Sequence, residues 1–178
     1  SPDKLYEEPV NSFVAEFIGE NNTFSGQVTD ISGGKCKVKL DTGAEIISNP
    51  IRVKTKGEKT KVSLRPERAI IDPEEKMDNK HKGKIEEVIY HGDHARVRLN
   101  LLGNKEFILK VPNSSARMDI KPGNEINVGW NSNDARALDP KSIWDWFNQK
   151  ILILNNNKLK SEVDLIFFNC CNKKIINV

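Results

Sequence analysis

Alternating apolar and polar residues run through most of the chain and predict short β-strands. In residues 35–40 three apolar side chains alternate with three lysines, which is the two-residue period of a strand with one buried face. Residues 22–50 therefore predict a meander of hairpins, with turns at residues 32–34 and 41–43. A charged loop is expected at residues 54–61.

A second set of alternating segments follows a polar connector at residues 72–82. Its predicted strands are residues 83–90, 95–99, 106–111 and 124–130, with turns at residues 91–94 and 121–123. Many short strands at this spacing are typical of a small barrel or sandwich. The expected fold is therefore mostly β.

The two β blocks meet at residues 62–67, whose sequence is VSLRPE. Apolar and polar residues alternate up to Leu64, as in a half-buried strand. Pro66 then ends the strand, because proline has no N–H to give the ladder and fixes its own φ. Arg65 and Glu67 flank this stop, which predicts a charge pair at the rim of a fixed corner.

One short amphipathic helix is predicted ahead of the strands, from Leu5 to Gly19. Its apolar residues share one face of a helical wheel: Val10, Phe13, Val14, Phe17 and Ile18. Pro9 suits the first helical turn, and Gly19 suits the left-handed position that ends a helix.

The composition limits the possible size, environment and partners of the protein. The 178 residues can bury the core of one domain or of two small ones, and the net charge of +3 neither demands nor excludes nucleic acid. Three cysteines without a C-x-x-C pair indicate a reduced, cytosolic environment. No apolar run has the length of a membrane span, so membrane association is expected through a partner. The sequence starts at Ser1 without a signal-peptide pattern and is expected to be a fragment of a longer one.

Four segments carry a resemblance to a known family: VSLRPE, KGKIEEVIYHGDHARVRL, FILKVPN and PGNEINVGWNSNDARALD. They resemble the C-terminal accessory domain of ABC-importer ATP-binding subunits, the transport-associated OB-type (TOBE) domain, and most of all its spermidine/putrescine class. LYEEPVNSFVAEFIGE, at residues 5–20, is similar to the closing helix of the family's nucleotide-binding domain. The resemblance covers residues 5–139 and implies an OB-like small barrel.

The resemblance divides the chain into three parts. Residues 1–20 would be the end of a missing nucleotide-binding domain with a linker helix, and residues 21–140 an accessory domain in two β blocks joined near residues 62–82. Residues 141–178 would be an atypical tail. The residues that match the family signature are expected to be structural or interface residues and not catalytic ones: Leu64, Arg65, Pro66, Glu67, Gly92, Asp93, Gly129 and Trp130.

The tail has a different composition from the rest of the chain. Residues 141–178 are dominated by Asn, Lys, Ile, Leu and Phe and contain no Gly, Ala, Arg or Pro. One interpretation is a lineage-specific C-terminal helix. The other, which the composition favours, is a segment not selected with the domain, such as frameshift or readthrough of AT-rich DNA would encode.

Nucleotide chemistry is not expected in this chain. Residues 31–35, ISGGK, resemble the ABC signature LSGGQ, but an alternating strand follows them where the signature must open a helix. Residues 56–60, KGEKT, do not satisfy the P-loop pattern. Without Walker A and Walker B motifs the fragment is expected to be non-catalytic and to bind no cofactor. ATP and Mg²⁺ would belong to the missing domain.

Residues 91–94, His-Gly-Asp-His, are the best candidate for metal ligands. Two histidines and a carboxylate in one tight turn point in different directions, however, and no fourth ligand is evident. The favoured interpretation is a hairpin turn in which Gly92 and Asp93 occupy positions that tolerate unusual φ. Vicinal Cys170 and Cys171 lie in the tail and predict no site, so no metal is expected.

The resemblance also implies a function. The parent subunit would hydrolyse ATP to energise import of a polyamine such as spermidine or putrescine, at the cytoplasmic face of the bacterial inner membrane. Its partners would be a second ATPase subunit, paired through the accessory domains, integral-membrane permease subunits, and regulators that dock on this domain. No nucleic acid is expected.

Two alternatives remain open from the residues alone. An OB-type module could bind single-stranded nucleic acid through Lys35, Lys37 and Lys39 or through Arg96 and Arg98, but exposed aromatic platforms are also needed. The aromatic residues of the β blocks are few: Phe24, Tyr90, Phe107 and Trp130. In the second alternative the barrel senses polyamine directly through acidic residues: Glu86, Glu87 and Glu106.

Overall fold

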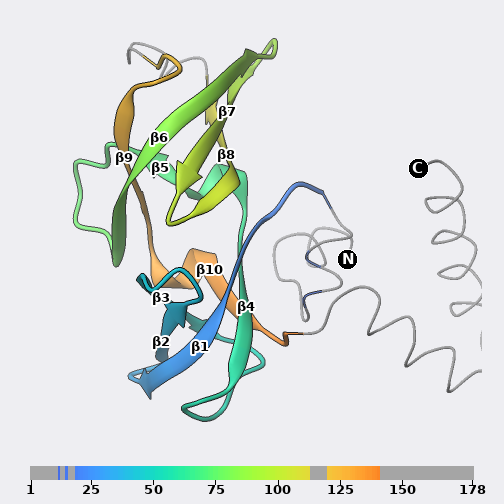
Figure 1. Ribbon diagram of the computed structural model, residues 1–178, viewed down its shortest axis with the longest axis vertical. Coiled ribbons are helices and arrows are strands. Elements are labelled where there is room, and N and C mark those ends of the chain that lie inside the picture. The colour runs from blue at the N-terminus through green and yellow to red at the C-terminus, as the bar shows by residue number, and fades with distance from the viewer. Residues whose placement is uncertain (1–11, 13–14, 16–18, 113–119, 141–178) are drawn as a thin grey trace, which may run out of the picture. The chain divides into compact units, whose positions relative to one another are not determined.

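The computed structural model describes Ser12, Ala15, residues 19–112 and residues 120–140. The chain divides into two compact units, residues 1–140 and 141–178, and all described residues lie in the first. These residues form β-strands joined by turns and two short 3-10 helices (Figure 1). The predicted mostly-β fold is confirmed.

Two five-stranded sheets make up the domain. The first is a closed barrel in the order β1 (Asn22–Ser32), β2 (Lys35–Leu40), β3 (Glu45–Pro50), β10 (Ala135–Leu138) and β4 (Lys59–Leu64). The second has the order β5 (Ile70–Ile71), β9 (Glu125–Trp130), β6 (Asn79–Tyr90), β7 (His94–Leu101) and β8 (Asn104–Pro112). The helices η1 (Pro66–Arg68) and η3 (Ser132–Asp134) connect β4 to β5 and β9 to β10.

Strict alternation explains why these segments are strands. Every second residue of β2 and of β7 is buried, and the residues between them are exposed or half-buried. The buried side chains of both sheets belong to one hydrophobic cluster, which includes Val38 from the first sheet and Val97 from the second. A helix with this sequence pattern would leave half of these apolar side chains in water.

Tight turns with left-handed residues close one hairpin in each sheet. Gly33 and Gly34 have φ values of 56° and 75°, so the Ser-Gly-Gly segment is the tight turn that the sequence predicts and not a phosphate-binding signature. Leu102 and Gly103, with φ values of 54° and 83°, form a similar turn between β7 and β8 that the pattern did not indicate.

Two predicted boundaries are wrong. The expected loop at residues 54–61 ends earlier, because β4 begins at Lys59. The expected connector at residues 72–82 is also shorter, since β6 begins at Asn79 and pairs with β9 from its first residue. The residues Asn-Lys-His-Lys look like a loop in sequence, but backbone pairing with β9 makes them a strand.

The strands do not follow the two blocks expected from the sequence. β10 follows β9 in the chain but lies in the first barrel, between β3 and β4 (Figure 1). The short strand β5 follows β4 but pairs with β9 in the second sheet. The last strand of each block therefore pairs within the sheet of the other block. We call the two places where the chain passes from one sheet to the other the crossings, and the first of them lies within residues 62–82.

The predicted N-terminal helix falls mostly outside the described residues. Ser12 and Ala15, which are described, are helical and buried, and Gly19 has the left-handed φ of 79° expected where a helix ends. The tail, with Cys170 and Cys171, lies wholly outside them. Among the described residues no helix has the length and apolar character needed to cross a membrane.

Candidate functional site

The described strands form two repeats of one arrangement, residues 22–71 and residues 79–138. Asn22 opens β1 and Asn79 opens β6, and each starts a long strand followed by a hairpin. A register shift falls at the same distance from each asparagine, between Val28 and Asp30 in β1 and between Ile85 and Glu87 in β6. The common features establish which residue of one repeat corresponds to which of the other.

The exchanged strands obey this correspondence. The paired residues are Ile70 with Gly129 and Ile71 with Val128 in one crossing, and Arg136 with Ser63 and Ala137 with Val62 in the other. Both crossings use a short 3-10 helix, η1 after β4 and η3 after β9. The exchange is reciprocal, so neither repeat completes its sheet without the other.

Two asparagine side chains join the repeats at equivalent positions. The amide of Asn22 donates to the carbonyl of Ile108 at 2.8 Å and accepts from its N–H at 2.7 Å. The amide of Asn79 makes the same pair of bonds with Ile47, also at 2.8 and 2.7 Å. Each side-chain amide thus acts as a backbone peptide would, and extends one repeat's strand pairing onto the other.

Two carboxylates make a second pair of equivalent contacts. Glu20, just before β1, accepts a hydrogen bond from Arg96 Nε of the second repeat at 2.8 Å. Asp78, just before β6, accepts from Lys35 Nζ of the first repeat at 2.8 and 2.9 Å. The register of the hairpins places Lys35 and Arg96 at corresponding positions of β2 and β7. An ion pair therefore joins the residue before each long strand to the other repeat.

Six of the eight residues expected from the family signature lie at these two crossings: Leu64, Arg65, Pro66, Glu67, Gly129 and Trp130. Leu64 ends β4 and Trp130 ends β9, and both are about 1% exposed. Arg65 directly precedes η1, and Pro66 and Glu67 lie within it. Leu64 and Trp130, which lie far apart in the sequence, are thus equivalent residues of one repeated junction, because each pairs with the asparagine that opens its repeat.

Arg65 does not lie at an exposed rim as the sequence suggested. Its side chain is 5% exposed, and its guanidinium donates to the backbone carbonyl of Glu20 at 3.0 Å. Glu67 is exposed. Arg65 therefore connects the strand-exchange junction to the segment that enters the domain.

The comparisons with known proteins agree with this geometry. Residues 62–138, which run from the first crossing to the end of β10, match the family described as the TOBE domain. This stretch contains both crossings and all eight signature residues. The resemblance to the TOBE domain is confirmed.

The chain is similar to proteins of known name. The spermidine/putrescine import ATP-binding protein of Trichodesmium erythraeum is 30% identical over 146 residues, which are 78% of this chain and 38% of the relative. The protein of the same name from Fusobacterium nucleatum is 33% identical over 117 residues, 62% of this chain and 31% of the relative. The chain thus matches less than two-fifths of either relative, and the resemblance to the polyamine class is confirmed.

A solved structure supports the fold. The cytoplasmic molybdate-binding protein ModG superimposes with a TM-score of 0.59 at 17% identity, over 67% of this chain and 96% of that chain. At this identity the likeness is one of fold alone. It confirms the OB-like small barrel expected for a TOBE domain.

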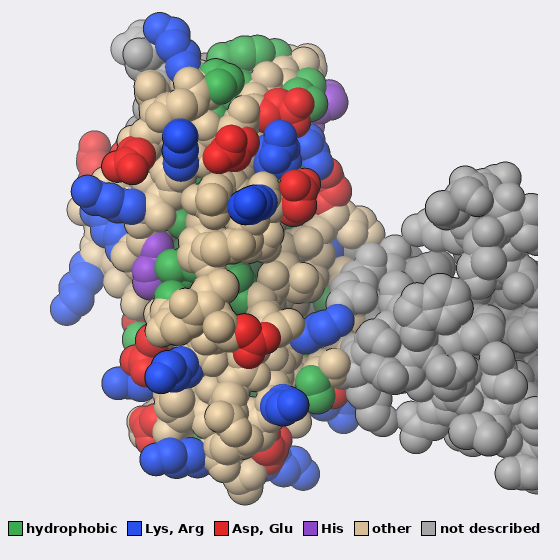
Figure 2. Space-filling model, viewed as in Figure 1, with side chains coloured by type: hydrophobic (Ala, Val, Ile, Leu, Met, Phe, Trp, Pro, Cys, Tyr) green, Lys and Arg blue, Asp and Glu red, His purple; other side chains and the backbone are tan. Residues whose placement is uncertain are grey.

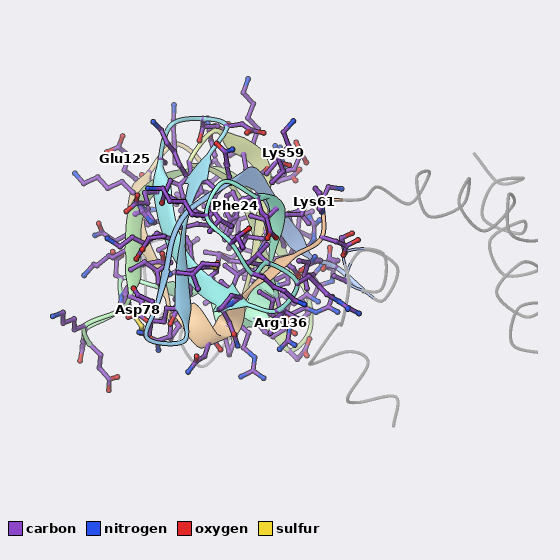
Figure 3. The ribbon with its side chains drawn as sticks, turned by 90° about the horizontal axis from the view of Figure 1, so that it is seen from below. Phe24, Lys59, Lys61, Asp78, Glu125 and Arg136 are labelled. Carbon is purple, nitrogen blue, oxygen red and sulfur yellow. The ribbon has the colours of Figure 1, made fainter. Side chains whose placement is uncertain are left out.

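Three of the four aromatic residues of the β-strands lie in the core and do not form a binding platform. Phe24, Phe107 and Trp130 are at most 5% exposed, and their ring centroids lie 5.7 to 6.3 Å apart. Phe24 points into the interior, whereas Lys59 and Lys61 lie at the periphery (Figure 3). Tyr90 is 67% exposed, at the end of β6. The nucleic-acid alternative is therefore not supported.

The charged side chains on the strand faces form ion pairs with one another. Lys35 and Lys37 lie within 4.0 Å of Asp78 and Glu45, and Arg98 contacts both Glu87 and Glu106. On the face shown in Figure 2, side chains of the two signs alternate without a patch of one sign. Glu86 is exposed at the register shift of β6. Because Glu87 and Glu106 already contact Arg98, the acidic set does not favour a polyamine site.

Gly92 and Asp93 lie apart from the crossings, in the turn between β6 and β7. Neither has a φ in the left-handed region, so the expectation of unusual φ there is wrong. The N–H of His91 donates to the carbonyl of His94 at 2.8 Å, and the two imidazole rings stack at 5.0 Å. No group of His, Cys, Asp and Glu within the described part could hold a metal ion.

Gly129 is a position where the TOBE junction requires glycine. A Cβ there would lie 2.7 Å from Pro73 Cγ and 3.0 Å from Met77 Cγ, in the segment that crosses over β9. We expect Gly129→Ala to lower the free energy of unfolding by about 1–3 kcal/mol, from overpacking. Gly92→Ala is the matched control, since a Cβ there meets nothing within 4 Å. Urea unfolding measures both, and equal effects would contradict the close approach.

Asp78 should make part of the stability pH-dependent. Hydrogen bonds from Lys35 and from Ser132, through both its hydroxyl and its N–H, hold the pKa of the Asp78 carboxyl well below its usual range. A lowered folded-state pKa stabilises the fold above the unfolded pKa of about 3.9, and this contribution is lost as pH falls further. We expect Asp78→Asn to cost about 1 kcal/mol at pH 7. The difference from the native chain should shrink below pH 4 in unfolding curves, and a constant difference would refute the assignment.

The repeat was missed from sequence, although a signal exists. Asn22 and Asn79 are each followed by a glycine four residues later, Gly26 and Gly83, and then by a β-branched residue two further on. These glycines allow close strand approach, because a Cβ at Gly26 would clash with the carbonyl of Lys39 and one at Gly83 would lie 3.0 Å from a Leu101 methyl. The pattern is short and the hairpins differ in length, so it does not stand out.

Proposed function

We propose that this chain is an accessory part of an ABC-importer ATP-binding subunit of the polyamine class. The observation that carries the proposal is the TOBE match across both crossings, together with relatives named spermidine/putrescine import ATP-binding proteins, one of which aligns over 78% of this chain. Because the chain spans only about a third of those relatives, the import activity and its solute are part of the proposal.

The domain would contribute shape and contacts, and no bond would be made or broken in it. Its reciprocal strand exchange, with buried amide pairs at Asn22 and Asn79, makes the two repeats one unit. Such a unit can transmit force without internal deformation, which suits a body attached to a moving ATPase. We propose that it pairs with a second subunit and acts beside membrane permease subunits at the cytoplasmic face of a bacterial inner membrane.

A non-catalytic role predicts that the chain does not bind nucleotide. Calorimetric titration of the purified chain with ATP and Mg²⁺ should give no binding heat up to millimolar concentration. Micromolar binding would place nucleotide chemistry in this chain and would overturn the division of roles. No cofactor is proposed.

The accessory role can be tested with a chimera. The matched portion of the Fusobacterium nucleatum relative is replaced by residues 20–140 of this chain, and uptake of labelled spermidine is measured in cells that lack their own importer. We expect uptake above that of the same relative with the portion deleted. If the chimera is well expressed and folded but the cells show no uptake, an accessory role in polyamine import is refuted. A chimera carrying Trp130→Ala controls for folding of the grafted domain.

A further inference from the structure

The segment that leads into β1 is held by cationic side chains from both repeats. Glu20 Oε1 accepts a hydrogen bond from Arg96 Nε at 2.8 Å, and Glu20 Oε2 lies 3.2 Å from Lys110 Nζ. The backbone carbonyl of the same residue accepts from Arg65 at 3.0 Å. Glu20 is thus fixed through its side chain by the second repeat and through its backbone by the first.

Arg96 and Lys110 form a ready site for a carboxylate. They lie directly opposite each other in the β7–β8 register, and like charges in that position destabilise a sheet. Their side chains are only 27% and 30% exposed, so water screens the repulsion incompletely. The carboxylate of Glu20 lies within reach of both cations and offsets their repulsion.

Glu20 remains ionised in this arrangement. Burial raises the pKa of its carboxyl, but the hydrogen bonds and positive charges of Arg96 and Lys110 together outweigh burial and lower it. The three side chains lie on the partly exposed surface, where such contacts open and close without unfolding the core.

We propose that Glu20 is a latch that fixes the direction in which the chain before it leaves the TOBE domain. A second contact supports this role, because the N–H of Ser12 donates to Asp139 Oδ1 at 3.0 Å, just beyond β10. The N-terminal segment therefore touches the domain at two separated points, one on each side of Gly19. The latch depends on these contacts alone, whereas its use in coupling the domain to an ATPase rests on the proposed function.

The equivalent contact of the other crossing supplies a matched control. Asp78 and Lys35 make the same kind of ion pair, but they tie the connector between the repeats and not the incoming segment. Losing Asp78 should weaken the domain without freeing residues 19–20. Losing Glu20 should free residues 19–20, and it should also lower the stability of the domain because the repulsion between Arg96 and Lys110 is then no longer offset, but the order of β7 and β8 should not change.

Backbone ¹⁵N relaxation of the intact chain tests the latch. In Glu20→Gln we expect the order parameters at positions 19 and 20 to fall from about 0.85 to below about 0.7, with those of β7 and β8 unchanged. Asp78→Asn should leave positions 19 and 20 as in the native chain. Unchanged values in Glu20→Gln, or an equal fall in both variants, would overturn the proposal.

A charge swap separates the ion pair from a general loss of packing. Glu20→Lys alone should loosen positions 19 and 20. Adding Arg96→Glu should restore at least half of the lost order, since the carboxylate introduced on β7 would then lie between the new ammonium group and that of Lys110. Failure of the swap to restore order would show that charge does not hold the segment. These measurements need no ATP, permease or polyamine. Their outcome therefore tests the latch independently of the uptake experiment, which tests the proposed function.

Discussion

Replacing Trp130 with alanine should lower the free energy of unfolding by about 3–5 kcal/mol, the largest effect expected of any single substitution in the domain. The indole is 1% exposed at the end of β9, and its ring centroid lies 6.3 Å from those of both Phe24 and Phe107. Truncation removes this contact area and leaves a cavity where the repeats meet. Chemical denaturation followed by circular dichroism gives the value.

Two further variants show whether the effect belongs to the junction. Leu64 occupies the equivalent position in the first repeat and is also 1% exposed, so Leu64→Ala should cost about 2–4 kcal/mol. Tyr90→Ala removes an aromatic ring that is 67% exposed and should stay within about 0.5 kcal/mol of the native chain. A loss at Trp130 no greater than at Tyr90 would mean that the aromatic cluster does not stabilise the fold.

The strands could be predicted from sequence because their period is local. In β2 and β7 each buried residue is followed by a polar one, so burial and secondary structure give the same answer. Tight turns such as Gly33–Gly34 were equally legible, since their φ values suit glycine. Strand boundaries failed where a polar segment pairs with a distant strand, as at Asn79.

The strand exchange could not be predicted, because nothing local distinguishes a strand that stays in its block from one that leaves it. Ala135–Leu138 and Ile70–Ile71 are apolar segments that would fit either sheet. Their destination depends on where β4 and β9 have unpaired edges, which is a property of the whole domain. The family resemblance singled out six residues that lie at the crossings, and it did not show that the two crossings are equivalent.

Polar residues at the junction were the least predictable part. Asn22 and Asn79 look like ordinary loop or turn residues in sequence, yet they are 2% and 3% exposed. Glu20, Asp78 and Arg65 likewise look like surface charges, and their partners lie 43 to 90 positions away. Long-range polar contacts leave no periodic trace, so a single sequence does not reveal them.

The second large loss of stability is expected when the side-chain amide of Asn22 is removed. Asn22→Ala removes the side-chain donor and acceptor that bind the carbonyl and the N–H of Ile108 across the junction, and Ile108 itself is 8% exposed. Each buried backbone group left without a partner costs about 1–3 kcal/mol. We therefore expect a loss of about 3 kcal/mol, measured by urea unfolding.

Asn79→Ala breaks the equivalent contact with Ile47 but should cost less, about 2 kcal/mol, because Ile47 is half-buried and water can take the vacated positions. Asn133→Ala, at an exposed residue of η3, is the control and should stay within about 0.5 kcal/mol. Asn22 is expected to cost more than Asn79 because its partner Ile108 is less accessible to water than Ile47, and Asn133 is expected to cost least because it is itself exposed. If Asn22→Ala matched the control, the amide could not be joining the repeats, and the rigid unit proposed for the accessory domain would lose its physical basis.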